Sequence, residues 1–411
     1  MSVIMDHTLA LGKEGYLFIR NRCDQLNTDL FETKILGEKA ICMYGEEATK
    51  LFYDTNKFER KNAAPKRIQK TLTGQNAIQG LDGAEHLHRK QLFTSILDES
   101  AKEVIAENLM TLWMASIDPW EKSEEIILFD EAKEKICEAA CQWAGVPLTI
   151  LGRREKADDF AAMVNGFGGV GPRHWKGRSA RTRTEAWMQG IITDVRSGKL
   201  EVEEGTPLHA VAFHKDINGV FLDEKIAGIE MINIIRPIVA TSTYVTFLAL
   251  ALCENPEWNE RLRESGEEYY EMFVQEVRRF YPFTPFMAAR VKQEFTWKGQ
   301  MFPVGTLVVL DVYGTDHDQR IWKDPHVFRP ERFENWDFQE FEFIPQGGGS
   351  RETGHRCPGE GVVVDLMKTT LDFLVNRIDY QVPAQDLSYS LSRIPALPES
   401  KFIINKVTRK A

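Results

Sequence analysis

The 411-residue chain has no apolar run that reaches the roughly 18 residues needed to cross a membrane. Its first residues also lack the basic stretch followed by an apolar core that marks a signal peptide. Six cysteines are scattered without a spacing typical of a disulfide framework. These absences predict a chain without a membrane span, in the reducing environment of the cytoplasm.

Other absences exclude whole classes of partner and cofactor. The net charge of −10 makes nucleic acid a poor general partner. No Gly-Lys-Ser/Thr follows the glycine cluster near residue 348, so the cluster is not a phosphate-binding loop. No Gly-x-Gly-x-x-Gly follows a predicted strand, and we find no internal repeat. With 43% apolar residues, the composition is that of an ordinary globular protein with a large core.

Residues 343–360 combine a glycine-rich loop, a cysteine, and the start of a helical pattern. Apolar side chains then recur every three or four residues, which predicts a helix with one buried face: Val363, Met367, Thr370, Leu374 and Ile378. Pro358 fits the first helical position, where a missing N–H costs nothing. Cys357 is therefore expected at a helix N-terminus, whose free amides and dipole favour a thiolate.

The residues near Cys357 limit which roles this cysteine can have. A single cysteine is most often an inert apolar side chain. Zinc is disfavoured, because no second cysteine lies within a few residues. The glycines at 347–349 and 354 allow positive φ angles and a close approach to something large and flat. A thiolate beneath such a loop suits the axial ligand of a haem iron.

With three further motifs, the chain resembles the cytochrome P450 superfamily. These are Glu276-Val-Arg-Arg279, the Pro-Glu-Arg-Phe segment that ends at Phe333, and Phe343 at the start of the cysteine loop. Phe343 lies 14 residues before Cys357, which is longer than the family's usual spacing. This longer loop with three glycines looks like the bacterial fatty-acid peroxygenase branch.

The resemblance implies a mainly α fold with a small β region, in which residues 1–411 form one haem-thiolate domain. Haem b (iron protoporphyrin IX) would lie between a central kinked helix and the helix that follows Cys357. His86 and Lys90 share a helix face; that face is either solvated or, by resemblance, binds the haem propionates. The resemblance also implies a buried triad of Glu276, Arg279 and Arg332. The cofactor-binding residues are expected to be Cys357, Arg60, His86, Lys90, Arg290, Gln346, Gly347, Gly348, His355, Pro358 and Gly359.

Residues 223–253 are apolar on nearly every side, which predicts a buried central helix. Pro237 must kink that helix, because it removes a hydrogen bond and clashes with the carbonyl of Asn233. Arg236 cannot lose its charge and therefore needs an anionic partner. The partner is either a carboxylate of the protein or, as the resemblance implies, that of a substrate. The acid–threonine pair that monooxygenases of the superfamily carry at the kink is absent.

The resemblance implies hydroxylation of long-chain fatty acids at the α or β carbon, with hydrogen peroxide as co-substrate and no obligatory redox partner. The carboxylate paired with Arg236 would act as acid–base in peroxide heterolysis, beside Pro237 and Gln79. Gln79 matches the glutamine of hydroxylating relatives, although Thr73 stands where some relatives have phenylalanine. Phe283, Phe286 and Val170 are expected to contact the substrate. The alternatives are a fatty-acid decarboxylase that forms terminal alkenes, a reductase-dependent monooxygenase, and a haem-thiolate sensor.

The remaining segments predict local structure. We expect strands at 31–35 and 39–44, helices at 46–54 and throughout 101–160, a hairpin at 296–310 and another near 393–398. Cys137 and Cys141 are spaced for one helix face but lack further metal ligands, so they are expected in the core. The glycine-rich loop at 165–172 leads into a basic run ending at Arg183. That run is either a solvated helix end or a collar that attracts anionic substrates.

Overall fold

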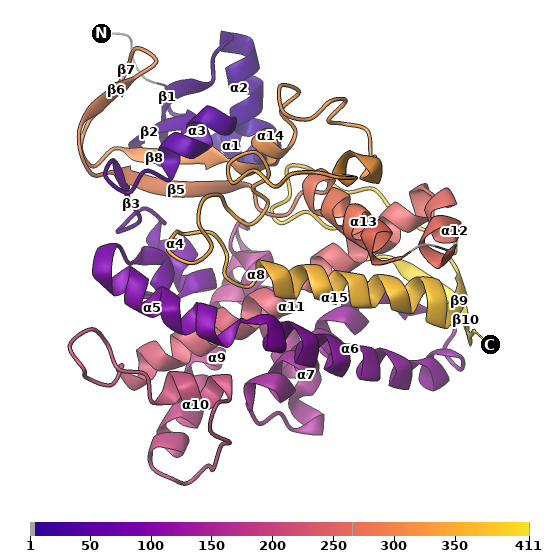
Figure 1. Ribbon diagram of the computed structural model, residues 1–411. Coiled ribbons are helices and arrows are strands. Elements are labelled where there is room, and N and C mark those ends of the chain that lie inside the picture. The colour runs from indigo at the N-terminus through magenta and orange to yellow at the C-terminus, as the bar shows by residue number, and fades with distance from the viewer. Residues whose placement is uncertain (1–4, 265, 411) are drawn as a thin grey trace.

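The computed structural model describes residues 5–264 and 266–410. Helices form most of it, and a smaller β region lies at one corner (Figure 1). The helices are α1 Thr8–Glu14, α2 Phe18–Leu26, α3 Glu46–Phe52, α4 Lys66–Ile68, α5 Gly83–Ile96, α6 Glu99–Trp120, α7 Leu128–Ala144, α8 Arg153–Gly166, α9 Pro172–Arg196, α10 Pro207–Ala212, α11 Glu224–Glu254, α12 Glu257–Glu264, α13 Glu267–Phe280, α14 Val312–Asp316 and α15 Glu360–Asp372. The strands are β1 Leu30–Ile35, β2 Glu38–Met43, β3 Phe58–Glu59, β4 Ile126–Ile127, β5 Phe286–Val291, β6 Phe295–Trp297, β7 Gln300–Phe302, β8 Leu307–Asp311, β9 Ile378–Gln381 and β10 Ile403–Arg409.

The main sheet has the strand order β1-β2-β8-β5-β3, and only the β2–β8 pair is parallel. The predicted strands at 31–35 and 39–44 are confirmed as the antiparallel pair β1–β2. The hairpin predicted at 296–310 is confirmed only as β6–β7, because β8 instead joins the main sheet. The hairpin predicted near 393–398 is wrong. That stretch is a loop between β9 and β10, held in place by the burial of Leu397 rather than by a ladder of backbone bonds.

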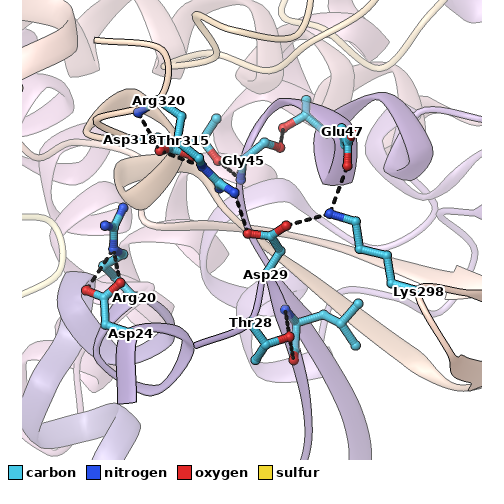
Figure 2. A network of polar contacts seen from close by, with 12 residues as sticks. Arg20, Asp24, Thr28, Asp29, Gly45, Glu47, Lys298, Thr315, Asp318 and Arg320 are labelled. Atoms are coloured by element: carbon cyan, nitrogen blue, oxygen red, sulfur yellow. Dashed lines mark hydrogen bonds and ion pairs between the residues drawn. The ribbon is translucent and has the colours of Figure 1, made fainter. Parts of the chain in front are cut away.

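A network of ion pairs connects the edge of this sheet to the β6–β7 hairpin (Figure 2). Asp29 accepts from Lys298 at 2.5 Å and from Arg320 at 2.6 Å, and Arg320 also pairs with Asp318. Lys298 belongs to the turn of the β6–β7 hairpin and reaches Glu47 of α3 as well. Half-exposed pairs of this kind contribute modestly, so the network mainly fixes how the hairpin lies against the sheet.

The predicted central helix is confirmed as α11, which packs on α7, α9 and α15. Asp223 caps its first turn by accepting from the amides of Lys225 and Ile226. The helix runs through Pro237 to Glu254. It is long and apolar enough to cross a membrane, but 94% of its most apolar window is buried inside the protein. An apolar helix covered on all sides is the centre of the core.

The helix predicted throughout 101–160 is confirmed for α6, α7 and α8. It is wrong for residues 121–127, which hold a turn and β4, and for residues 145–149, which connect α7 to the turn before α8. Cys137 and Cys141 are fully buried in α7, and their positions in the core are confirmed. Residues 5–264 and 266–410 contain no group of three or more histidine, cysteine or acidic side chains that could hold a metal ion.

The helix predicted after Cys357 is confirmed as α15, with Val363, Met367 and Thr370 buried. Its start is not where the sequence predicts. Gly359 is the N-cap and Glu360 the first helical residue, so Pro358 lies in the turn before the helix. Beyond Asp372 the chain makes one wider turn and enters β9 at Ile378.

The triad of Glu276, Arg279 and Arg332 is confirmed at the contact between α13 and the Pro-Glu-Arg-Phe turn. The carboxylate of Glu276 is completely buried and meets Arg279 at 2.7 Å and Arg332 at 3.0 Å. It also accepts from the backbone amide of Arg329 at 2.8 Å. Arg279 belongs to α13 like Glu276 itself, whereas Arg329 and Arg332 belong to the turn, so the carboxylate locks the turn onto α13.

Replacing Glu276 by Ala should destabilise the fold by about 3–5 kcal/mol, because two buried guanidinium groups lose their counter-charge. A thermal melt of each purified variant measures this. Glu331→Ala is the matched control, since Glu331 pairs with Arg261 at the surface and should cost at most about 1 kcal/mol. Equal melting temperatures for the two variants would contradict a structural role for the triad.

Candidate active site

A cavity of about 240 Å³ lies where α11, α5 and the Cys357 segment meet. Segments far apart in the sequence supply its walls. Its lining residues are Ile78, Gln79, His86, Lys90, Phe93 and Leu97, then Asn233, Ile234, Arg236, Pro237 and Ile238 of α11, and finally Gln346, His355, Arg356, Cys357, Pro358, Gly359 and Val363. The cavity thus brings together most of the site residues that the sequence predicts.

Cys357 lies on the side of the cavity formed by the turn before α15. Its backbone amide donates to the carbonyl of Gln346 at 3.0 Å, which holds the turn against the glycine-rich loop. Burial raises the pKa of the Cys357 thiol, and the charge of Glu360 raises it as well. A hydrogen bond from the backbone amide of Gly359 has the opposite effect and lowers this pKa. In the protein alone, burial therefore outweighs the helix N-terminus that the sequence predicts will favour a thiolate.

Glu360 holds this side of the cavity together, and sequence analysis missed it. It pairs with Arg278 of α13 and, at 2.6 Å, with Arg356. Arg278 also donates to the side chain of Gln346 at 2.9 Å. The turn that carries Cys357 is therefore fixed on both sides by arginines, of which Arg278 is buried and Arg356 half-buried.

The side chains at the edge of the cavity on α5 are basic. Lys90 is buried and donates to the carbonyl of Arg356, and burial lowers the pKa of Lys90 to about 8. The rings of His86 and His355 stack with centroids 3.9 Å apart, and burial lowers the pKa of His86 to about 3. Asp82 lies 3.7 Å from His355. The solvated alternative for His86 and Lys90 is excluded, because both side chains are buried.

Arg60 lies behind this edge and does not line the cavity. Its guanidinium sits over the ring of Phe52 at 4.3 Å and donates to the Phe52 carbonyl. Burial lowers the pKa of Arg60, and no carboxylate among the described residues forms an ion pair with it. It is a second buried cation, with Lys90, that an anionic group could pair with.

Arg236 faces the cavity from the middle of α11, and it is 8% exposed. Its Nε has no hydrogen-bond partner, and no carboxylate among the described residues lies within ion-pair distance. Burial, together with the nearby charge of Arg181, lowers the pKa of Arg236 to about 9. The alternative of a structural ion pair within the protein is therefore excluded for the described residues.

The acid nearest to Arg236 along α11 is already paired. Glu230 is fully buried, and its Oε1 accepts from Arg89 of α5 at 2.6 Å and from the amide of Ile78 at 3.0 Å. Its Oε2 accepts from Asn233 at 3.2 Å. Because these donors hold Glu230, it cannot turn toward Arg236.

Gln79 reaches the cavity through the same network. Its Oε1 accepts from Nδ2 of Asn233 at 3.4 Å, and that amide also donates to the carbonyl of Thr73 at 2.9 Å. Asn233 lies one turn before Arg236, a spacing of three residues that could have identified it from the sequence. The network ties the segment carrying Gln79 to the helix carrying Arg236.

Three predicted substrate-contact residues do not line this cavity. Val170 is 76% exposed in the loop between α8 and α9. Phe283 packs against Tyr244, with ring centroids 4.6 Å apart. Phe286 starts β5 and packs on a separate apolar cluster that includes Phe18. The prolines around these phenylalanines impose an extended backbone, but they do not decide to which side the rings point.

Three predicted cofactor-binding residues are also placed elsewhere. Arg290 pairs with Glu38 and donates to the carbonyl of Asn62 at 3.0 Å, so its charge is taken up within the β region. A Cβ on Gly347 would lie 3.0 Å from the hydroxyl of Tyr53, and one on Gly348 would lie 2.9 Å from the carbonyl of Glu340. These glycines are needed for packing inside the protein, rather than for an approach to the cavity.

The residues present fit a haem. Cys357 and Arg236 face one cavity from different elements, as an iron ligand and a group beside the open coordination site require. Lys90 and Arg60 are buried cations that pair with no carboxylate of residues 5–264 and 266–410, which suits the two propionates of haem. Ile234, Val363 and Phe93 provide apolar walls for a flat macrocycle.

The comparisons with known proteins agree with this site. The family model described as Cytochrome P450 matches residues 214–403. Cytochrome P450SP alpha (CYP152B1), solved in complex with (R)-ibuprofen, is 43% identical, with 98% of this chain and 99% of the other aligned at a TM-score of 0.96. Cytochrome P450EX alpha (CYP152N1), solved with myristic acid, is 42% identical over 100% of both chains, also at 0.96.

A variant of cytochrome P450 OleT in complex with arachidonic acid is 36% identical, with 100% of this chain and 99% of the other aligned at a TM-score of 0.96. Among curated proteins, a mitochondrial cytochrome P450 4e5 of Drosophila mettleri is 31% identical over 122 residues. That match spans 30% of this chain and only 22% of the insect protein.

Proposed function

Because this chain belongs to the cytochrome P450 family, in the branch of the CYP152 enzymes, we propose that it hydroxylates long-chain fatty acids with hydrogen peroxide. The observation that carries the proposal is Arg236, a buried cation that faces the cavity and has no anionic partner among the described residues. A fatty-acid carboxylate supplies that partner. The family's cofactor is a haem with a cysteine thiolate ligand, which supplies the activation of peroxide, and we assign Cys357 as the ligand.

Arg236 binds and orients the substrate. A guanidinium holds a carboxylate by two parallel hydrogen bonds, which sets the direction of the attached chain as well as its position. The α and β carbons, next to the carboxylate, are then the ones fixed in the cavity that Cys357 also lines. Regioselectivity for these two carbons follows from anchoring the head group.

The held carboxylate also moves a proton. It accepts the proton from one oxygen of hydrogen peroxide and returns it to the other, which leaves as water when the O–O bond breaks. The first oxygen ends in the hydroxyl group of the product, so that fatty acid and peroxide give hydroxy acid and water. No acidic side chain lines the cavity over the described residues, so the substrate itself provides this group. A substrate without a carboxylate should therefore fail to react.

Gln79 and Pro237 complete the polar end of the cavity. Gln79 is held by Asn233, so its amide has a defined place near the substrate's head group. An amide cannot take up a proton at neutral pH, as a histidine at this position could. This favours hydroxylation over decarboxylation as the main outcome.

The wider assignment follows from the same site. We propose one haem-thiolate domain spanning residues 1–411, a cytoplasmic location, and no obligatory redox partner. Three solved relatives carry myristic acid, arachidonic acid or ibuprofen, all carboxylic acids, which supports a carboxylate-bearing substrate for this chain. A sensor without turnover has no use for an unpaired guanidinium beside the cofactor.

Purified holoprotein, hydrogen peroxide and myristic acid should suffice to form hydroxymyristic acid. Mass spectrometry of the products should show α- and β-hydroxy acids in excess of the alkene one carbon shorter. Methyl myristate is the control and should not be turned over, since its ester cannot pair with Arg236 or carry a proton. An absolute need for a ferredoxin or flavin reductase would place the enzyme among the ordinary monooxygenases, and a dominant alkene would make it a decarboxylase.

A further inference from the structure

A second recess, of about 630 Å³, opens between α9, the start of α11 and residues 70–76. Four cationic side chains line it: Lys70, Arg178, Arg181 and Lys225. Two acids also line it: Glu185 neutralises Arg181 of the same lining at 2.7 Å, and Asp223 caps α11. Lys70, Arg178 and Lys225 form no ion pair with any described residue. On a chain with a net charge of −10, this is a local excess of positive charge.

The recess also has an apolar part. Ile226 and Ile229 of α11 line it, beside the basic side chains. A small inorganic anion needs no such surface, whereas an amphipathic anion uses both parts. The lining therefore matches a carboxylate with an alkyl chain attached.

The lining of the recess and that of the cavity that holds Arg236 are both hydrogen-bonded to one peptide group. The carbonyl of Thr73 accepts from Arg181, which lines the recess, at 3.4 Å, and from Asn233, which lines the cavity, at 2.9 Å. The next residue, Gly74, has a φ of +83°, and a Cβ there would lie 2.4 Å from Nη2 of Arg181. Only glycine fits at this position beside Arg181.

Charge connects the two compartments. The charge of Arg181, in the lining of the recess, helps to lower the pKa of Arg236, in the lining of the cavity. The two guanidinium groups therefore repel each other. A carboxylate near either one is attracted by both. The favourable potential for an anion thus extends from the recess to Arg236.

We propose that this recess is a capture site for the carboxylate of the incoming fatty acid, which it holds before the substrate reaches Arg236. The proposal rests on the proposed function, because it needs a fatty-acid substrate. It also selects between the two interpretations of the basic run that ends at Arg183: Arg178 acts on the anionic substrate rather than only solvating a helix end. Arg181 is buried and paired with Glu185, so it forms part of the wall of the recess.

Stopped-flow binding of myristate to the holoprotein, followed by the haem absorption change, tests the proposal. The variant Arg178→Gln/Lys225→Gln removes two exposed charges from the recess. Its association rate constant should fall about three- to tenfold at low ionic strength and return to the wild-type value at high salt. The dissociation rate constant should stay unchanged, because Arg236 is intact.

The matched control is Lys176→Gln/Lys199→Gln, which changes the net charge equally. Lys176 lies two residues before Arg178 on α9, and neither lysine lines the recess. This control should bind myristate at the wild-type rate. Tetradecanol, which has no charge, should associate equally fast with all three proteins.

Equal association rates of myristate for the wild type and both double variants would overturn the capture site while leaving the proposed function intact. A second myristate detected by calorimetry, with unchanged association at the haem, would make the recess a separate binding site and overturn capture as well. If the wild type neither binds nor hydroxylates myristate, both the proposed function and the capture site fail.

Discussion

Replacing Arg236 by Ala should leave a folded protein that binds haem but turns over fatty acids with peroxide about 10³-fold more slowly, or not at all. The loss combines two effects of one guanidinium, which fixes the head group and keeps a proton-carrying carboxylate in place. The protein has no substitute within reach, because Glu230 is held by Arg89 and the Ile78 amide. Product formation per unit of haem, measured with myristic acid, gives the ratio.

Stability separates this prediction from simple damage to the fold. In the free protein Arg236 is a buried charge whose Nε has no hydrogen-bond partner, and such a group costs free energy. The Ala variant should therefore melt at or above the wild-type temperature while losing activity. Arg236→Lys keeps a charge but cannot form two parallel bonds, so it should retain some turnover with a wider spread of hydroxylated positions. An Ala variant with wild-type turnover would rule out the carboxylate anchor.

The parts of the molecule that sequence analysis predicted well depend on local patterns. The α11 helix follows from apolar residues on every side of a long segment, although its cap at Asp223 was not predicted. The triad around Glu276 is confirmed as well, but it was expected from the resemblance to the family and not from the local pattern. Cys357, His86 and Lys90 reach one cavity because each is tied to a helix end or a helix face.

The parts that could not be predicted depend on contacts between distant segments. Arg89 and Glu230 are 141 residues apart, and only the packing of α5 on α11 makes them partners. The same holds for Gly347, whose positive φ was expected to serve a cofactor but instead makes room for Tyr53. In irregular segments, composition indicates backbone freedom but not what the backbone approaches.

The start of α15 shows how a small error in register changes the chemistry. With Pro358 as the first helical residue, the free amides of the helix would surround the Cys357 sulfur. In the structure the helix begins at Glu360, so its carboxylate, rather than only amides, lies close to the thiol. Arg278 and Arg356 neutralise that carboxylate. The electrostatic setting of Cys357 is therefore built by three side chains that the cysteine motif alone does not identify.

Replacing Cys357 by Ser should abolish the long-wavelength absorption band of the reduced carbonyl complex from which the family takes its name. A neutral hydroxyl does not donate electron density to iron as a thiolate does. The substitution should preserve the fold, since the amide of residue 357 still bonds to the Gln346 carbonyl and the side chain is nearly isosteric. Absorption spectra of the reduced, carbonyl-treated protein give the answer.

Cys253→Ser is the matched control, because Cys253 is exposed at the end of α11 and should leave the band unchanged. Burial raises the pKa of the Cys357 thiol in the protein alone, so the positive charge of the metal must supply most of the stabilisation of the thiolate. The haem-free protein should accordingly react with thiol reagents at Cys253 first and at Cys357 slowly at neutral pH. A band that survives in Cys357→Ser would mean that another residue binds the iron.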